Sequence, residues 1–186
     1  MVMADSQIAR AIQDSEIKIS PVPHADQIQP ASLDVRLGHS FITFEEYAGQ
    51  TINPVEGVLA EGKIEHQHGG LFNLSPGQFV LAQTFESIGL ANDIVARVEG
   101  CSSLGRLGLM VHVTAGFIDP GWPLAPITLE LHNVSPYNII LTPEMKIAQL
   151  SFDRMELEAT RPYGSSSLNS HYANQNGVTA SRYGKD

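Results

Sequence analysis

Apolar and polar residues alternate along much of this chain with a period of two. The alternation is clearest at 33–37 and 127–132, and continuous runs that favour strands occupy 79–82, 138–141 and 147–152. Alternation is typical of a strand with one buried face, and short apolar runs fit fully buried strands. Eleven prolines divide the chain into strand-length pieces. The pattern predicts a mainly all-β fold, a sandwich or a barrel.

Only one segment has helical spacing. Apolar residues recur every three or four positions from Ile8 to about Ser15, and Asp5 or Ser6 can cap the start. The polar, glycine-bearing stretch 57–70 predicts a loop. We therefore expect a short N-terminal helix, followed by strands and one long loop.

The segment 163–177 follows the last predicted strand and is rich in Gly, Ser, Asn and Gln. Its composition fits a disordered terminus. Tyr163, His171 and Gln175 could instead reach polar groups of a ligand, so that the segment orders over it. Both interpretations stay open at this point.

Composition narrows the classes of function. The 186 residues, 20.2 kDa, suit a single domain spanning 1–186. Lys and Arg number 11 against 20 Asp and Glu, and the formal charge of −9 disfavours a binder of nucleic-acid polymers. An anionic nucleotide remains compatible, because backbone amides and a few local cations can bind it within an acidic protein.

Cysteine content and the first residues bear on the compartment. Cys101 is the single cysteine, which excludes an intrachain disulfide and a multi-cysteine zinc site. No apolar stretch is long enough to span a bilayer, and residues 1–5 lack the basic and apolar regions of an export signal. We expect a soluble cytoplasmic protein with no membrane partner.

Three short segments carry the candidate chemistry. Residues 99–106 combine two glycines, two serines and Arg106, a set that suits an anion. Residues 114–122 place Asp119 in a turn, and Glu130 lies on the polar face of its predicted strand. Taken singly, each segment is more simply explained as an ordinary turn, helix start or solvated side chain.

Taken together and in this order, the segments resemble the dCTP deaminases of the trimeric dUTPase-like superfamily. The resemblance covers nearly the whole chain, through residues 28–38, 100–122, 129–131, 146–150, 161–166 and 172–177. It implies a distorted β-barrel or jelly-roll core with a short N-terminal helix and a C-terminal lid over 163–186. It also implies a homotrimer with active sites between subunits.

The resemblance implies a catalytic set. Such enzymes hydrolyse the 4-amino group of dCTP without zinc, and this sequence lacks the signature of zinc deaminases. Glu130 would be the general base that activates water and the acid that returns the proton. Ser102 and Arg106 would hold the water and stabilise charge, and the Ala115 backbone would orient the water and the amine.

The resemblance also implies how the nucleotide binds. Asp119 would contact the sugar, and the backbone at Thr128 and Leu129 would read the pyrimidine edge. The triphosphate, with Mg²⁺ as cofactor, would be held by Cys101, Ser102, Ser103, Leu104, Gly105, Arg106, Gln149, Tyr163, His171 and Gln175. The implied substrates are dCTP and dUTP, and relatives of this kind are inhibited by dTTP.

The residues after Ala115 separate two branches of this family. Gly116-Phe117 fits the branch that continues to dUMP and diphosphate, whereas the dUTP-forming branch has His-Arg. A glycine at this position would leave room for a second water near the phosphates. Three alternatives stay open. They are a deaminase that releases dUTP, a relative with altered nucleotide preference, and a non-catalytic nucleotide-binding regulator.

Three features depart from the family pattern. Cys101 stands where Arg or Lys is usual and His171 where Lys is usual, so two cations are missing from the triphosphate site. The segment 122–127 is about one residue longer than usual and rich in proline. A shift of one residue in the following strand would turn Glu130 to the other face.

Other candidate residues have simpler explanations. His66-Gln67-His68 could suggest a metal site, but it lies in the predicted loop, and we expect it to be solvated. His112 sits in an apolar run, and we expect a satisfied core or interface histidine. Cys101 as a nucleophile fits no neighbouring chemistry, so we interpret it as a replaced phosphate contact.

Overall fold

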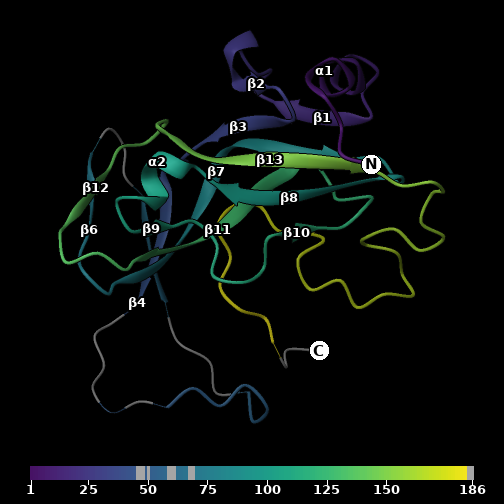
Figure 1. Ribbon diagram of the computed structural model, residues 1–186. Helices are drawn as coiled ribbons and strands as arrows, with labels where there is room; N and C mark the ends of the chain where they lie inside the picture. Colours follow the sequence, from purple (N-terminus) through teal and green to yellow (C-terminus); the bar gives the residue numbers. More distant parts are fainter. Residues whose placement is uncertain (45–48, 50, 58–61, 67–69, 184–186) are drawn as a thin grey trace.

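Two antiparallel sheets make up the body of the molecule (Figure 1). The computed structural model describes residues 1–44, 49, 51–57, 62–66 and 70–183. In this part of the chain, the first sheet has the order β5 (Gly62–His66), β4 (Ser40–Phe44), β7 (Phe79–Leu90), β11 (Ala125–Asn133) and β9 (Leu109–Met110), with β1 (Ile17–Ser20) paired to β7. The second has the order β10 (Phe117–Ile118), β8 (Ile94–Gly100), β13 (Lys146–Arg154), β3 (Ser32–Arg36) and β2 (Ile28–Gln29).

The remaining elements are short. β6 (Phe72–Leu74) pairs with β12 (Ile139–Leu141), and η1 (Ala25–Gln27) is a single 3₁₀ turn. The helices are α1 (Asp5–Gln13) and α2 (Ser102–Gly105). A mainly β fold with a short N-terminal helix is therefore confirmed. In the described part of the chain, no helix is both long and apolar enough to cross a membrane.

The start of α1 differs from the expected cap. The residue before the helix is Ala4, and Asp5 is already helical. The Gln7 side chain accepts a hydrogen bond from Ala4 N at 3.0 Å through Oε1, so the helix start is held by a side chain of its own first turn and not by a capping Asp5 or Ser6. The helix buries Ile8 and Ala11, as its spacing predicts.

β11 confirms the alternation read from the sequence. Its residues at alternate positions from Ala125 to Leu131 are buried, and Thr128 and Glu130 on the other face are partly exposed. The longer segment before β11 has therefore not turned Glu130 toward the core.

β3 departs from simple alternation. Leu33, Val35 and Leu37 are buried as predicted, but Asp34 is buried as well, at 6% exposure. β3 lies between β2 and β13 and also contacts α1 and β7, so both of its faces are covered. The Asp34 carboxylate is compensated by an ion pair with Lys146.

The predicted loop 57–70 is partly wrong. Residues 62–66 form β5, which pairs with β4 from Ser40 opposite His66 to Phe44 opposite Gly62. The sequence of residues 62–66 alone does not indicate this strand, because the strand depends on pairing with β4, which lies earlier in the chain. Gln67 and His68 lie outside the described residues.

Candidate active site

The Glu130 carboxylate is fixed against the loop that follows β9. Its Oε2 accepts hydrogen bonds from Val113 N at 2.7 Å and from Thr114 N at 3.1 Å, directly before Ala115. The Glu130 N–H donates to Val111 O at 3.1 Å and holds the same loop. Hydrogen bonds to a charged acceptor are strong, so they fix the orientation of this oxygen. Among the described residues Oε1 has no partner, and it can therefore exchange a proton with another molecule.

The residue after Ala115 is closely packed. Gly116 O accepts a hydrogen bond from Val98 N at 2.8 Å. A Cβ on Gly116 would lie 3.1 Å from Val98 O and 3.2 Å from Cε1 of His112. The expectation that this glycine leaves open space for water is wrong on this side of the loop, because β8 and His112 fill it. Phe117, which begins β10, is exposed.

Three polar atoms around this loop and strand are buried without a hydrogen-bond partner among the described residues. Thr128 Oγ1 and Gln83 Oε1 belong to facing residues of β11 and β7, and the third is His112 Nδ1. An unpaired buried polar atom is costly, so these atoms favour a ligand, a water or a second chain. The expectation of a satisfied core histidine is wrong for His112, and the interface histidine expected as the alternative stays a prediction. Gln83 was missed, and its only signal is a polar residue within an apolar strand.

A cavity of about 430 Å³ lies between the turn at Asp119 and the C-terminal segment. Asp119, Tyr163 and His171 line this cavity together, although His171 lies 52 positions after Asp119 in the sequence. Arg161, which sequence reasoning did not place in the site, also lines the cavity. It supplies a guanidinium group beside the expected triphosphate contacts.

Tyr163 is held from both sides. Its N–H donates to Pro120 O at 2.8 Å, its hydroxyl accepts from Tyr172 N at 3.1 Å, and its ring centroid is 4.6 Å from that of Trp122. Burial raises the pKa of the Tyr163 phenol, and the charge of Asp119 raises it further, against the lowering effect of the Tyr172 N–H. The neutral phenol is therefore retained at neutral pH and can donate to a phosphate oxygen.

The C-terminal segment is folded onto the molecule. Gln175 is buried, and its Nε2 donates to Pro126 O of β11 at 2.9 Å. Arg182 donates from Nη1 to His171 O at 2.6 Å and from its backbone N to the Tyr172 hydroxyl at 3.1 Å. These contacts favour the ordered interpretation of the segment over a disordered terminus.

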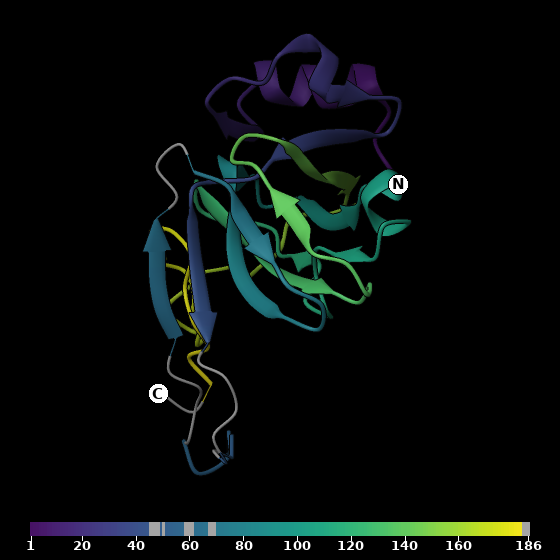
Figure 2. The ribbon, with the colours of Figure 1, turned by 90° about the vertical axis from the view of Figure 1, so that its left-hand side faces the viewer.

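The segment 99–106, which was predicted to bind an anion, lies apart from the cavity beside Asp119. α2 comprises Ser102 to Gly105, with Cys101 before it and Arg106 after it, and both views place it apart from the C-terminal segment (Figures 1 and 2). The side chains of Ser102, Ser103 and Arg106 are exposed, and none makes a hydrogen bond or ion pair with a described residue. Within one chain, the structure does not bring Ser102 or Arg106 to Glu130.

Gln149 belongs to the side of the molecule that carries α2. It lies in β13 opposite Glu99, close to the end of β8 that leads into α2, and its Oε1 accepts from Ser32 Oγ at 3.0 Å. The predicted site residues thus form two groups. One surrounds Glu130 and the cavity, and the other surrounds α2.

No group of three or more His, Cys, Asp or Glu side chains is placed to hold a metal ion among the residues that the structure describes. His66 belongs to β5, and Gln67 and His68 lie outside the residues that the structure describes.

Comparison with known proteins identifies the family. A family model described as dCTP deaminase-like matches residues 2–155. A dCTP deaminase of Haloarcula marismortui is 43% identical, over 98% of this chain and 94% of that protein. A protein of Dictyoglomus thermophilum named "dCTP deaminase, dUMP-forming" is 42% identical, over 100% of this chain and 96% of that protein. The crystal structure of 2'-deoxycytidine 5'-triphosphate deaminase from Agrobacterium tumefaciens has the same fold, with a TM-score of 0.59 and 24% identity over 81% of this chain and 46% of that chain. This chain belongs to the dCTP deaminase-like family.

Proposed function

We propose that this protein is a dCTP deaminase of the dUMP-forming kind. It converts dCTP and water to dUTP and ammonia, and then dUTP and a second water to dUMP and diphosphate. The observation that carries the proposal is the Glu130 carboxylate, held by two amides directly before Ala115. The second step is supported by full-length relatives named for it and by the pair Gly116-Phe117.

Glu130 has the geometry of a group that shuttles protons. Its Oε2 is held by the loop, and its Oε1 takes a proton from the water that attacks C4 of cytosine. The carboxyl group then gives this proton to ring nitrogen N3, takes a second proton from the new hydroxyl group on C4 and passes it to the amine. The C4–N bond breaks, ammonia leaves, and the carbonyl oxygen of uracil comes from the water. The Ala115 backbone would orient the water and the amine.

The cavity beside Asp119 fits the sugar and phosphates. Asp119 would contact the deoxyribose, and Tyr163, His171 and Arg161 would face the triphosphate. These side chains are mostly neutral or cationic donors, which suit phosphate oxygens. Mg²⁺ would therefore enter as part of the substrate, bound to the phosphates themselves.

The base would lie over β11. Thr128 and Leu129 would present backbone groups to the pyrimidine edge. The Thr128 hydroxyl and the Gln83 amide oxygen, both buried and unpartnered among the described residues, offer further hydrogen bonds. A bound ligand or its waters would satisfy these atoms.

The two groups of site residues support an active site shared between chains. Ser102 and Arg106 are exposed and make no hydrogen bond or ion pair with Glu130 of their own chain, so we infer that a neighbouring chain supplies them. A closed ring of identical subunits gives every site one half from each of two neighbours. We infer that the protein works as a homotrimer.

Two further expectations concern regulation and compartment. dTTP has the same deoxyribose and triphosphate as dCTP, so we expect it to compete for the cavity beside Asp119. We expect the enzyme to act in the cytoplasm, where it would meet free nucleotides.

The deciding experiment incubates the protein with Mg–dCTP and separates the products. We expect dUMP and diphosphate, with one ammonia released per dUMP. Accumulation of dUTP without dUMP would show that the protein catalyses deamination alone. Bound but unchanged dCTP would instead identify a nucleotide-binding regulator.

The matched control is Glu130→Gln, which preserves shape but cannot shuttle protons. We expect deamination to fall by about 10²-fold or more, with the melting temperature nearly unchanged. Residual turnover above a few per cent of the wild-type value would assign the proton transfer to another group.

A further inference from the structure

The ladder between β7 and β11 contains a bulge three residues before Glu130. Residues 84–86 of β7 lie opposite the single residue Ile127 of β11, with regular pairs on either side. β7 therefore has two extra residues at this point. Because that number is even, the alternation of faces is kept on both strands. A bulge interrupts the ladder, so its backbone groups need other partners.

The Thr84 side chain supplies the missing partner. Its hydroxyl oxygen accepts a hydrogen bond from Ile127 N at 2.9 Å, and its O–H donates to Glu86 O at 2.6 Å. Thr84 is fully buried, so no water competes for these bonds. The hydroxyl thus joins the two strands where the backbone ladder is interrupted.

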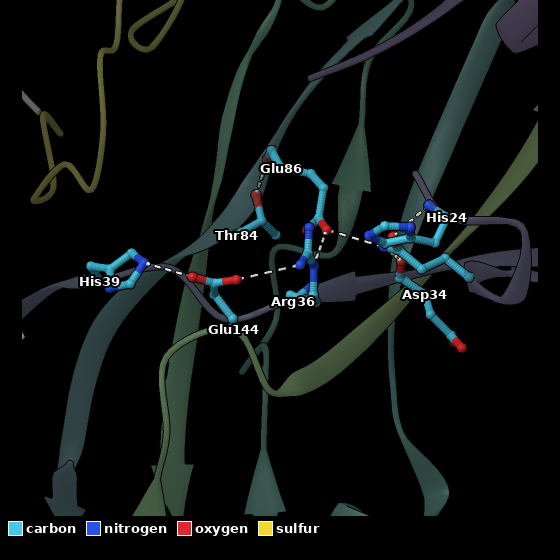
Figure 3. A network of polar contacts seen from close by, with 8 residues as sticks. His24, Asp34, Arg36, His39, Thr84, Glu86 and Glu144 are labelled. Carbon is cyan, nitrogen blue, oxygen red and sulfur yellow. Dashed lines mark hydrogen bonds and ion pairs between the residues drawn. The ribbon is translucent and has the colours of Figure 1, made fainter. Parts of the chain in front are cut away.

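The other side of the bulge is anchored to β3 (Figure 3). Glu86 is fully buried and accepts from Arg36 N and Arg36 Nε, each at 2.8 Å, and from Gln27 Nε2 at 3.1 Å. The Arg36 guanidinium also lies 4.5 Å from the centroid of the Phe85 ring. A buried ion pair holds its geometry well when its hydrogen bonds are satisfied in this way.

The network continues to the surface from Arg36. Its Nη1 lies 3.5 Å from Glu144 Oε2, and His39 Nε2 lies 3.6 Å from Glu144 Oε1. All three bulge residues are therefore tied to neighbouring elements: Thr84 to β11, and Phe85 and Glu86 to β3. Each bulge residue is therefore held by a contact of its side chain.

We infer that Thr84 is a positioning residue for Glu130. Its hydroxyl fixes Ile127 and so fixes the strand segment from which the Glu130 carboxylate projects. Misplacing a catalytic group by about 1 Å can cost about 100-fold in rate. A small displacement at this bulge should therefore lower kcat. The inference rests on the proposed role of Glu130 in deamination.

The test compares Thr84→Val, which keeps the shape and removes the hydroxyl, with Thr84→Ser, which restores it. For Thr84→Val we expect kcat for dCTP deamination to fall about tenfold or more, with KM changed less than about twofold. Thr84→Ser should recover most of the lost kcat. Thr142→Val, which removes a hydroxyl from an exposed turn, is the control for the substitution itself.

A purely stabilising hydroxyl would give a different result. Thr84→Val would then melt at a lower temperature but keep the wild-type kcat per folded enzyme well below its melting point, and the inference would be overturned. If Thr84→Val does not fold, Thr84→Ser is compared with Thr84→Cys, because serine keeps the hydroxyl that accepts from Ile127 N and cysteine offers only a weak acceptor. A lower kcat per folded enzyme in Thr84→Cys than in Thr84→Ser supports the positioning role, and equal values overturn it.

Glu130→Gln is measured in parallel, so that the two ideas can fail separately. Wild-type turnover in Glu130→Gln would remove the proposed function. If Glu130→Gln is inactive and Thr84→Val is fully active, only the positioning role of Thr84 is refuted.

Discussion

Gln175 donates a hydrogen bond from Nε2 to Pro126 O at 2.9 Å, and this bond fastens the C-terminal segment to the strand that carries Glu130. Pro126 lies beside the bulge, two residues before Thr128. The C-terminal segment is therefore attached to the strand from which Glu130 projects, four residues before it in the chain. Loss of that attachment should affect substrate retention before it affects the chemistry.

Gln175→Ala should raise KM for dCTP more than it lowers kcat. Losing one buried hydrogen bond removes about 1 kcal/mol, equivalent to about fivefold in affinity. Steady-state kinetics measure the effect, and Asn176→Ala, at the exposed neighbouring position, is the matched control. An unchanged KM in Gln175→Ala would mean that this segment does not cover the bound nucleotide.

Mixed trimers should recover activity from two inactive variants. In the proposed shared site, Glu130→Gln and Arg106→Ala each remove one half, but a Glu130→Gln subunit still has an intact Arg106. Random mixing in equal amounts leaves about one site in four with both halves intact, so about a quarter of the wild-type activity should return. Light scattering should show a trimer for each parent. Failure of the mixture to regain activity, in trimers that exchange subunits, would place the whole site within one chain.

Gly116→Ala should destabilise the protein. The added Cβ would lie 3.1 Å from Val98 O, a backbone atom of β8 that has little room to move. Overpacking of this kind lowers the free energy of unfolding by about 1–3 kcal/mol. Gly100→Ala is the control, because its Cβ would meet only Val111 Cγ2 at an ordinary 3.8 Å. Equal urea denaturation midpoints for the two variants would contradict the close packing at Gly116.

Restoring the missing cations should strengthen dCTP binding. In Cys101→Arg and His171→Lys, each recovered contact should contribute about 1.5–3 kcal/mol if it reaches phosphate. Binding is measured in the Glu130→Gln background, which separates affinity from turnover. Asn174→Lys adds the same charge at an exposed position that does not line the cavity, so it should have little effect. An equal gain in Asn174→Lys would attribute the effect to net charge alone.

The local parts of the fold could be predicted from the sequence. Period-two alternation is a property of one strand, so the buried apolar positions of 33–37 and 127–132 could be read directly, but the burial of Asp34 could not. The resemblance to the family named Asp119, Tyr163 and His171, which line one cavity. It also named Ser102 and Arg106, which this chain alone does not bring to Glu130.

The relations between strands could not be predicted. The bulge at 84–86 depends on how β7 is registered against β11, and β5 exists because β4 lies beside it. Register is a long-range property, so neither feature has a local signal. Gln83 was missed for the same reason, because Thr128, the residue that it faces, is distant in sequence.

The amides that hold Glu130 belong to the main chain of Val113 and Thr114, and this determines which substitutions the loop can tolerate. Every residue except proline supplies a backbone N–H, so both side chains can vary while the carboxylate keeps its donors. A saturation library at the two positions, selected for activity, should therefore be depleted of proline and remain broad in other residues. Evolution can change the chemistry of this loop's outer surface without moving the Glu130 carboxylate behind it.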